Sequence, residues 1–388
     1  MPSDNLFSPA FGGLPQVFFG RTDELSFALD ALDNENSPRR AFFITGNRGC
    51  GKTTLLEKIS SLAAKHGWMT IDIHSSHVCQ SVMEALAGGT QKTIEKSASP
   101  SAMGVSLGRF SSTVTTSFTE ASLSNLLVEK CSSLKGRSGV LITIDEIQKV
   151  REDDAENLCA AAQIALRKGL PLMLILAGLP GSKEKVASYP GCTFMQRAYD
   201  MKLSSLQVNE TLEAFRGVFH RMPRWDIEDE AIWRLGVFSQ GYPYLMQLAG
   251  YYAVERARES LTEDRSPIAI SEDMVRAIEP VALAEYRANV LEPILNPLSE
   301  GLSSYLHAMC EVDSKDGRIS TGDVARRLGK SPMQVSVYRS RLIDRRLIEA
   351  DGRGYVRFLL PHVKEYYFDK VVPLEQKDPL QQWNRYEP

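Results

Sequence analysis

The sequence lacks any apolar run long enough to cross a membrane, and its start lacks the basic and apolar segments of a secretory signal. Its six cysteines are scattered over 388 residues without a CxxC pair, which argues against a disulfide framework and favours free thiols in a reducing compartment. These absences argue against a membrane-embedded or secreted protein. We therefore expect a cytoplasmic protein with no membrane partner.

A large net charge is also missing, because the formal total is only −3. An even spread of that charge would argue against a nucleic-acid partner, but the spread is uneven. Residues 318–357 contain ten basic and four acidic side chains, so this segment carries +6 and the remainder −9. The length predicts two or three domains, and 43% hydrophobic with 24% charged residues is ordinary for a globular protein.

Residues 46–53 contain a complete GxxxxGK[ST] phosphate-binding motif, which reads Gly46-Asn47-Arg48-Gly49-Cys50-Gly51-Lys52-Thr53. An apolar segment, Ala41–Ile44, precedes it and a helical pattern follows from Thr54, so the motif has the strand–loop–helix context that the chemistry needs. Main-chain N–H groups would hold phosphate oxygens, Lys52 would reach the terminal phosphates and Thr53 would offer a hydroxyl to Mg²⁺. We expect this loop, together with Thr54, to bind ATP.

A second apolar segment, Val140–Ile144, ends in the acidic pair Asp145 and Glu146. A strand buried on both faces has this pattern, and ligands gather at the carboxyl end of such strands. Asp145 would complete the Mg²⁺ site with Thr53, and Glu146 would act as general base toward the attacking water. The predicted activity is ATP hydrolysis.

Two further apolar segments, Trp68–Ile73 and Leu172–Ala177, follow helical patterns, which predicts a parallel α/β sheet with helices on both faces. Ser/Thr/Gly-rich residues 97–124 predict an inserted hairpin or mobile loop. We assign residues 1–205 to this core.

The segment Phe18–Leu25 resembles the F-x-G-R-x-x-E-L box of AAA+-type ATPases, in particular of the archaeal-ATPase and origin-recognition (initiator) branches and of STAND signalling ATPases. Gly241-Tyr242-Pro243 resembles the G-x-P motif of their helical lid. The resemblance implies that Phe19, Gly20 and Arg21 lie near the adenine and that Pro243 closes over the nucleotide. It extends to about residue 370.

The sequence departs from this family in two places. The segment Ala177–Pro180 is apolar where these ATPases carry a polar γ-phosphate sensor, and no arginine stands beside Pro243. Both departures favour a slow, switch-like ATPase. Arg197 matches the arginine finger of such proteins, which often acts from a neighbouring subunit and implies an oligomer in the ATP-bound state; an ordinary surface arginine is the alternative.

The remaining sequence predicts an all-helical lid over residues 206–297, a winged helix over 298–372 and a tail over 373–388. The third helix of the predicted winged helix begins at Ser331-Pro332 and runs to Arg346, and the hairpin turn 351–354 forms the wing. Candidate contacts to double-stranded DNA are on one flank of that helix and on the wing: Gln334, Arg341, Arg345 and Arg353.

Two functions remain open from the sequence. In the first, the nucleotide state controls DNA engagement through the winged helix, which the local positive charge favours. In the second, the chain is a STAND-type switch whose winged helix docks a protein partner.

Overall fold

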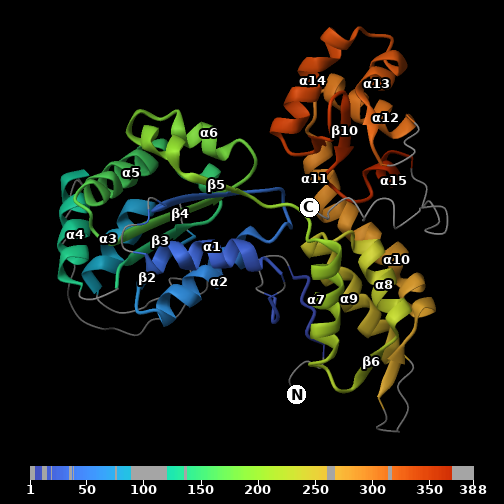
Figure 1. Cartoon of the computed structure of the whole chain (residues 1–388), viewed down its shortest axis with the longest axis horizontal. Coiled ribbons are helices and arrows are strands. Elements are labelled where there is room, and N and C mark those ends of the chain that lie inside the picture. Colours follow the sequence, from blue (N-terminus) through green and yellow to red (C-terminus); the bar gives the residue numbers. More distant parts are fainter. Residues whose placement is uncertain are drawn as a thin grey trace, which may run out of the picture.

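The computed structural model describes residues 5–10, 15–18, 20–34, 37, 39–74, 77–88, 120–134, 138–259, 267–312 and 317–368. The described chain forms three lobes, with the α/β core on the left of Figure 1, the lid at lower right and the C-terminal lobe at upper right. Most of the predicted insertion, and the tail, lie outside these residues. The last part of the predicted insertion was assigned wrongly, because a helix begins at Glu120 and buries Leu123.

The core contains one five-stranded parallel sheet in the order β2-β3-β4-β1-β5. Its strands are β1 (Ala41–Thr45), β2 (Met69–Ile73), β3 (Val140–Ile144), β4 (Leu172–Gly178) and β5 (Tyr199–Lys202). Parallel register pairs Phe42 with Ile175 on β4 and with Tyr199 on β5, so β1 lies inside the sheet. The predicted parallel α/β fold is therefore confirmed.

Helices cover both faces of this sheet because its strands are apolar on both sides. Phe42 of β1 packs toward α1 (Thr22–Asp33) and α2 (Lys52–Lys65), whereas Phe43 faces the opposite layer. That layer contains α3 (Val78–Gly88), α4 (Glu120–Ser133) and α5 (Glu152–Arg167). Short segments complete the core: η1 (Ile147–Lys149), α6 (Ser182–Ala187) and η2 (Pro190–Arg197).

The lid contains α7 (Val208–Phe219), α8 (Asp229–Ser239), α9 (Pro243–Arg258) and α10 (Glu272–Tyr286). It is not all-helical as predicted, because β6 (Trp225–Ile227) and β7 (Ile268–Ile270) form a two-stranded parallel sheet. Trp225 and Ile270 are buried there, and three-residue strands are too short to show a periodic pattern in the sequence. The N-terminal Phe7 also packs in the lid, against Phe215 and Phe219.

A π-helical segment, η3 (Arg287–Leu291), and α11 (Glu292–Leu295) lead from the lid into the C-terminal lobe. The lobe contains α12 (Glu300–Glu311), β8 (Ile319–Ser320), α13 (Thr321–Arg327), α14 (Pro332–Asp344), β9 (Ile348–Ala350), β10 (Tyr355–Phe358) and α15 (Val363–Phe368). Its three strands form an antiparallel sheet in the order β8-β10-β9. The lid and this lobe share one continuous apolar core. Within the part of the chain that the structure describes, no helix is long and apolar enough to span a bilayer.

Candidate functional site

The phosphate-binding motif lies between the carboxyl end of β1 and the first turn of α2, where the sequence predicts it. Gly49 and Gly51 adopt left-handed backbone with φ of 77° and 91°, a conformation that favours glycine. A Cβ on Gly46 would lie 2.5 Å from Cys50 Sγ, so that position also requires glycine. Tight packing of this kind holds the loop's main chain in one shape.

Lys52 is buried at 5% exposure, and its ammonium group remains within the loop. Its Nζ donates to the carbonyl oxygens of Gly46 and Asn47, both at 3.0 Å. Thr54 follows in the first turn of α2 and is half-buried. A buried cation held by carbonyl dipoles lies where the negative charge of a phosphate would be accepted.

Thr53 and Asp145 meet across β4, although 92 positions separate them in the sequence. The hydroxyl of Thr53 donates to Asp145 Oδ2, and Asp145 Oδ1 accepts from the main-chain N–H of Glu146 at 2.8 Å. A hydroxyl and a carboxylate oxygen at this position suit Mg²⁺, which takes few protein oxygens and completes its shell with phosphate and water. The two residues therefore fit the metal that the motif implies.

Glu146 stands at a left-handed position, φ 52°, at the start of η1. Its Oε2 accepts from Gln148 Nε2 at 2.7 Å and pairs with Lys149 Nζ at 3.3 Å. The Oε1 of Gln148 in turn accepts from the main-chain N–H of Leu179 at 3.2 Å, just after β4. Gln148 thus supplies polar contact at the strand end where the sequence shows only apolar residues. Sequence reasoning missed it, since the signal lies in a contact rather than a motif.

The lid touches the loop through the segment Tyr242-Pro243-Tyr244. The main-chain N–H of Tyr244 donates to Gly49 O at 3.1 Å, and the hydroxyl of Tyr242 donates to Arg48 O. A Cβ on Gly51 would stand 3.9 Å from the Pro243 ring, which is van der Waals distance. Burial raises the pKa of the Tyr242 phenol well above its usual range, so this donor stays protonated.

The N-terminal segment Phe18–Leu25 contacts the phosphate loop through Arg21. This residue is buried, and its backbone is left-handed with a φ of 59°. Its guanidinium donates to Cys50 O at 3.2 Å, to Ser204 O and to Glu24 at 3.1 Å. Gly20 is also left-handed and packs against Leu206, whereas Phe19 lies outside the described residues. Arg21 therefore connects the N-terminal segment Phe18–Leu25 to the phosphate loop at Cys50.

Arg197 lies far from the loop of its own chain. It is exposed at the end of η2, two residues before β5 begins, and β5 runs parallel to β1. Arg197 thus stands at the amino ends of strands whose carboxyl ends carry the phosphate loop, a strand length of roughly 15 Å away. Arg197 therefore does not belong to the group of side chains that surround the phosphate loop of its own chain.

In the C-terminal lobe, Arg341, Arg345 and Arg353 are exposed. Gln334 is exposed too, but its Oε1 accepts from Ser331 N at 2.9 Å and closes a capping box at the start of α14. The predicted third helix ends two residues early, at Asp344. Arg346, after the helix, contacts the phosphate loop, where Asn47 Nδ2 donates to Arg346 O at 2.6 Å.

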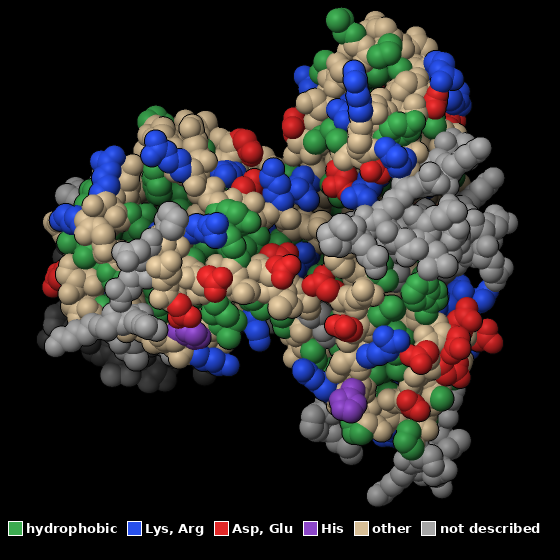
Figure 2. Space-filling model, viewed as in Figure 1, with side chains coloured by type: hydrophobic (Ala, Val, Ile, Leu, Met, Phe, Trp, Pro, Cys, Tyr) green, Lys and Arg blue, Asp and Glu red, His purple; other side chains and the backbone are tan. Residues whose placement is uncertain are grey.

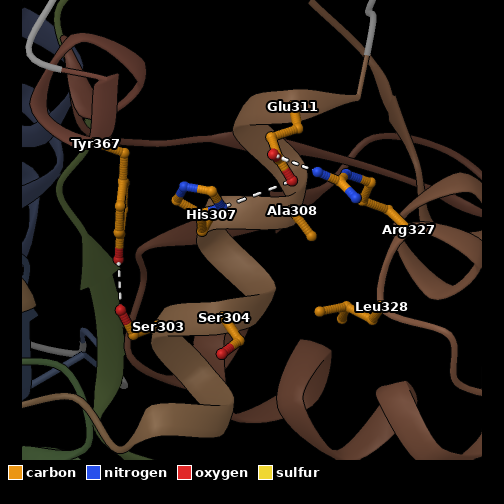
Figure 3. A pocket seen from close by; sticks show the side chains of 8 residues that line it. All are labelled: Ser303, Ser304, His307, Ala308, Glu311, Arg327, Leu328 and Tyr367. Atoms are coloured by element: carbon orange, nitrogen blue, oxygen red, sulfur yellow. Dashed lines mark hydrogen bonds and ion pairs between the residues drawn. The ribbon is translucent and has the colours of Figure 1, made fainter.

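A separate hollow of about 350 Å³ lies in the C-terminal lobe (Figure 3). Most of its polar side chains are paired with one another. Glu311 pairs with Arg327 and with His307, and Ser303 shares a 3.2 Å hydrogen bond with Tyr367. Arg327 lowers the pKa of the Glu311 carboxyl by donating to it. Since its charges are already neutralised, the hollow is a weak ligand site compared with the phosphate loop.

Comparison with known proteins agrees with this geometry. Residues 17–175 match the family model described as AAA ATPase domain, and residues 288–367 match a domain of unknown function, DUF8462. No curated protein matches the chain significantly.

Among solved structures, the Aeropyrum pernix ORC2 protein in ADPNP–ADP complexes is 16% identical with a TM-score of 0.58, and the match covers 93% of this chain and 95% of that one. The ADP form of the same protein is 16% identical with a TM-score of 0.52, and that match covers 93% of this chain and 96% of the other. The likeness shows a shared fold and confirms the resemblance drawn from the sequence. Residues 17–175 therefore match an AAA ATPase domain, and the chain shares the fold of the Aeropyrum pernix ORC2 protein.

Proposed function

We propose that this chain is an ATPase whose nucleotide state controls engagement of double-stranded DNA through a C-terminal winged helix. In this proposal the phosphate loop binds ATP, and Lys52 binds the terminal phosphates. Glu146 accepts the proton of the attacking water, and Thr53 with Asp145 holds Mg²⁺, which neutralises phosphate charge when bound. Gln148 orients the Glu146 carboxylate, to which it donates at 2.7 Å.

The C-terminal lobe supports the winged-helix assignment by its element order. Three helices, α12, α13 and α14, precede the hairpin β9–β10, and β8 joins that hairpin as a third strand. Gly352 and Gly354 turn the hairpin with φ of 85° and 83°. The exposed Arg341 and Arg345 on α14 and Arg353 on the hairpin suit a helix in the major groove with a wing on phosphate.

The contact between Arg346 and the phosphate loop supports the proposed coupling between the bound nucleotide and DNA binding. Arg345, a candidate DNA contact, directly precedes Arg346, whose carbonyl accepts a hydrogen bond from Asn47 of the phosphate loop. Lys and Arg side chains lie, together with Asp and Glu side chains, where the α/β core meets the C-terminal lobe (Figure 2). A shift of the loop on nucleotide binding would therefore move the end of α14 directly.

A second candidate function is a STAND-type switch that docks a protein. Met333 and Val337, one turn apart on α14, are 83% and 51% exposed. An apolar pair on the outer face of this helix suits a protein surface as well as thymine methyl groups.

We also propose a cytoplasmic location, which the free state of all six cysteines supports.

The deciding experiment is a duplex-DNA titration with ATP, with ADP and without nucleotide, across salt concentrations. We expect salt-sensitive binding that differs between ATP and ADP, and we expect Arg341→Ala/Arg345→Ala to lower the salt slope by about 2. The matched control removes two exposed lid arginines, Arg221→Ala/Arg224→Ala, and should leave the slope unchanged. Absence of duplex binding at low salt in every nucleotide state would reject DNA control in favour of the protein-docking alternative.

A further inference from the structure

Arg346 occupies a backbone position that normally belongs to glycine. Its φ is 53°, in the left-handed region, and two main-chain hydrogen bonds of the Schellman type close the end of α14 at this residue. The N–H of Arg346 donates to Ile343 O at 2.8 Å, and the N–H of Leu347 donates to Leu342 O at 3.0 Å. Glycine is the favoured residue at this point of such a helix end. An arginine here is locally unfavourable, and such outliers gather at functional sites.

Both ends of Arg346 touch the region around the phosphate loop. Its carbonyl accepts from Asn47 Nδ2 at 2.6 Å, and its Nη2 donates weakly to Leu203 O at 3.4 Å. Leu203 follows β5 and donates to Thr45 O at 2.8 Å, directly before the loop. A Cβ on Gly46 would stand 3.3 Å from the same Leu203 oxygen. The guanidinium therefore lies near Gly46, the first residue of the loop.

This end of the loop, at Gly46 and Asn47, is the one that faces the terminal phosphates in the proposed complex. Lys52 Nζ lies 3.0 Å from the carbonyls of Gly46 and Asn47, and the lysine of this motif reaches the β- and γ-phosphates. Among the described residues, no carboxylate forms an ion pair with Arg346. A charged guanidinium with only a long bond to a carbonyl has capacity for a stronger, charge-assisted partner.

We infer that Arg346 is a phosphate ligand supplied in cis by the C-terminal lobe, and that it contacts the γ-phosphate of ATP. The inference rests on the proposed binding of nucleotide at this loop. The Leu203 carbonyl is exchanged for a phosphate oxygen, and the main-chain contact with Asn47 keeps the residue in place. ADP lacks the γ-phosphate, so it leaves Arg346 on its carbonyl partner. The partner of the Arg346 guanidinium thereby depends on which nucleotide is bound.

The test compares Mg-ATP and Mg-ADP affinities of the full chain with those of Arg346→Gly. Glycine suits the left-handed position, so this variant should fold with an unchanged or higher melting temperature. We expect ATP affinity to fall about tenfold, as for loss of one charge-assisted hydrogen bond, while ADP affinity changes less than about twofold. Arg346→Asn, which also tolerates left-handed backbone, should give the same result. Arg326→Ala removes an exposed arginine from the same lobe and should change neither affinity.

The possible outcomes separate the inference from the proposed function. If the unaltered chain binds ATP but Arg346→Gly binds it equally well, the inference is wrong and the proposed nucleotide site stands. An equal loss of ATP and ADP affinity would also overturn it, because the γ-phosphate would then not be the partner. If the unaltered chain binds neither nucleotide, the proposed function itself fails.

Discussion

Lys52 shows at the scale of one residue how the loop is prepared for phosphate. Its charge is buried, and among the described residues its hydrogen bonds go to the carbonyls of Gly46 and Asn47. Lys52→Ala should therefore abolish ATP binding or strongly weaken it, since the variant keeps the loop but loses its cation. Calorimetry with Mg-ATP measures this, with Lys58→Ala on the same helix as the control. Undiminished heat in Lys52→Ala would contradict the assigned role.

Glu146 is assigned to turnover and not to binding. Glu146→Gln keeps the size of the side chain but cannot accept the proton of water, so we expect ATP affinity to persist while hydrolysis stops. Single-turnover hydrolysis beside equilibrium binding separates the two. Continued turnover in this variant would show that another group is the base.

Gln148 is a positioning residue for that carboxylate. Gln148→Leu removes its donor to Glu146 and its acceptor for the Leu179 N–H. We expect kcat to fall about tenfold or more while the dissociation constant for ATP stays constant, because the base loses its orientation and the loop is untouched. The control is Gln196→Leu, an exposed glutamine of η2. A lowered affinity with unchanged kcat would instead indicate a structural role.

At the scale of elements, the lid joins α8 to α10 by a buried ion pair. Arg234 donates from Nε and Nη2 to the two oxygens of Glu279 at 2.8 and 3.1 Å, and also reaches Glu272 at 3.0 Å. Burial raises the pKa of Glu279, and Arg234 opposes that rise. The Glu279 carboxylate therefore depends on Arg234 for two charge-assisted hydrogen bonds.

Arg234→Ala should lower the free energy of unfolding by about 3–5 kcal/mol, because it leaves a buried carboxylate without a partner. The variant's Glu279 then has a pKa raised further above its unfolded value near 4.5. A carboxyl whose pKa is raised in the folded state stabilises folding below its unfolded pKa and loses that effect as pH rises. The loss of unfolding free energy should therefore be smaller at pH 5 than at pH 8. Urea unfolding at both pH values measures this. Arg234→Met/Glu279→Leu should recover most of the loss, and a defect equal at both pH values would contradict the explanation.

At the scale of the whole molecule, Arg197 and the phosphate loop lie at opposite ends of the neighbouring strands β5 and β1. We expect Arg197→Ala to lose ATPase activity, and we expect mixing with Lys52→Ala to restore part of it. In mixed assemblies an intact loop from one chain meets an intact arginine from the other. Activity of the mixture above the sum of the separate variants would be the measured sign. Full activity of Arg197→Ala alone would leave Arg197 as an ordinary surface arginine.

The sequence by itself determined the features that depend on neighbouring residues. The phosphate loop, the buried strands and the acidic pair after β3 each lie within about eight consecutive positions, so their composition and spacing are sufficient to predict them. Local patterns also predicted most lid helices and the hairpin of the C-terminal lobe.

Only the tertiary structure decided the contacts between distant segments. The β6–β7 pair, the bridge from Gln148 to Leu179 and the contact of Asn47 with Arg346 join residues between 31 and 299 positions apart. The distance of Arg197 from its own loop likewise follows from strand direction in the folded sheet. Such contacts depend on the packing of whole elements, and no short stretch of sequence contains both partners.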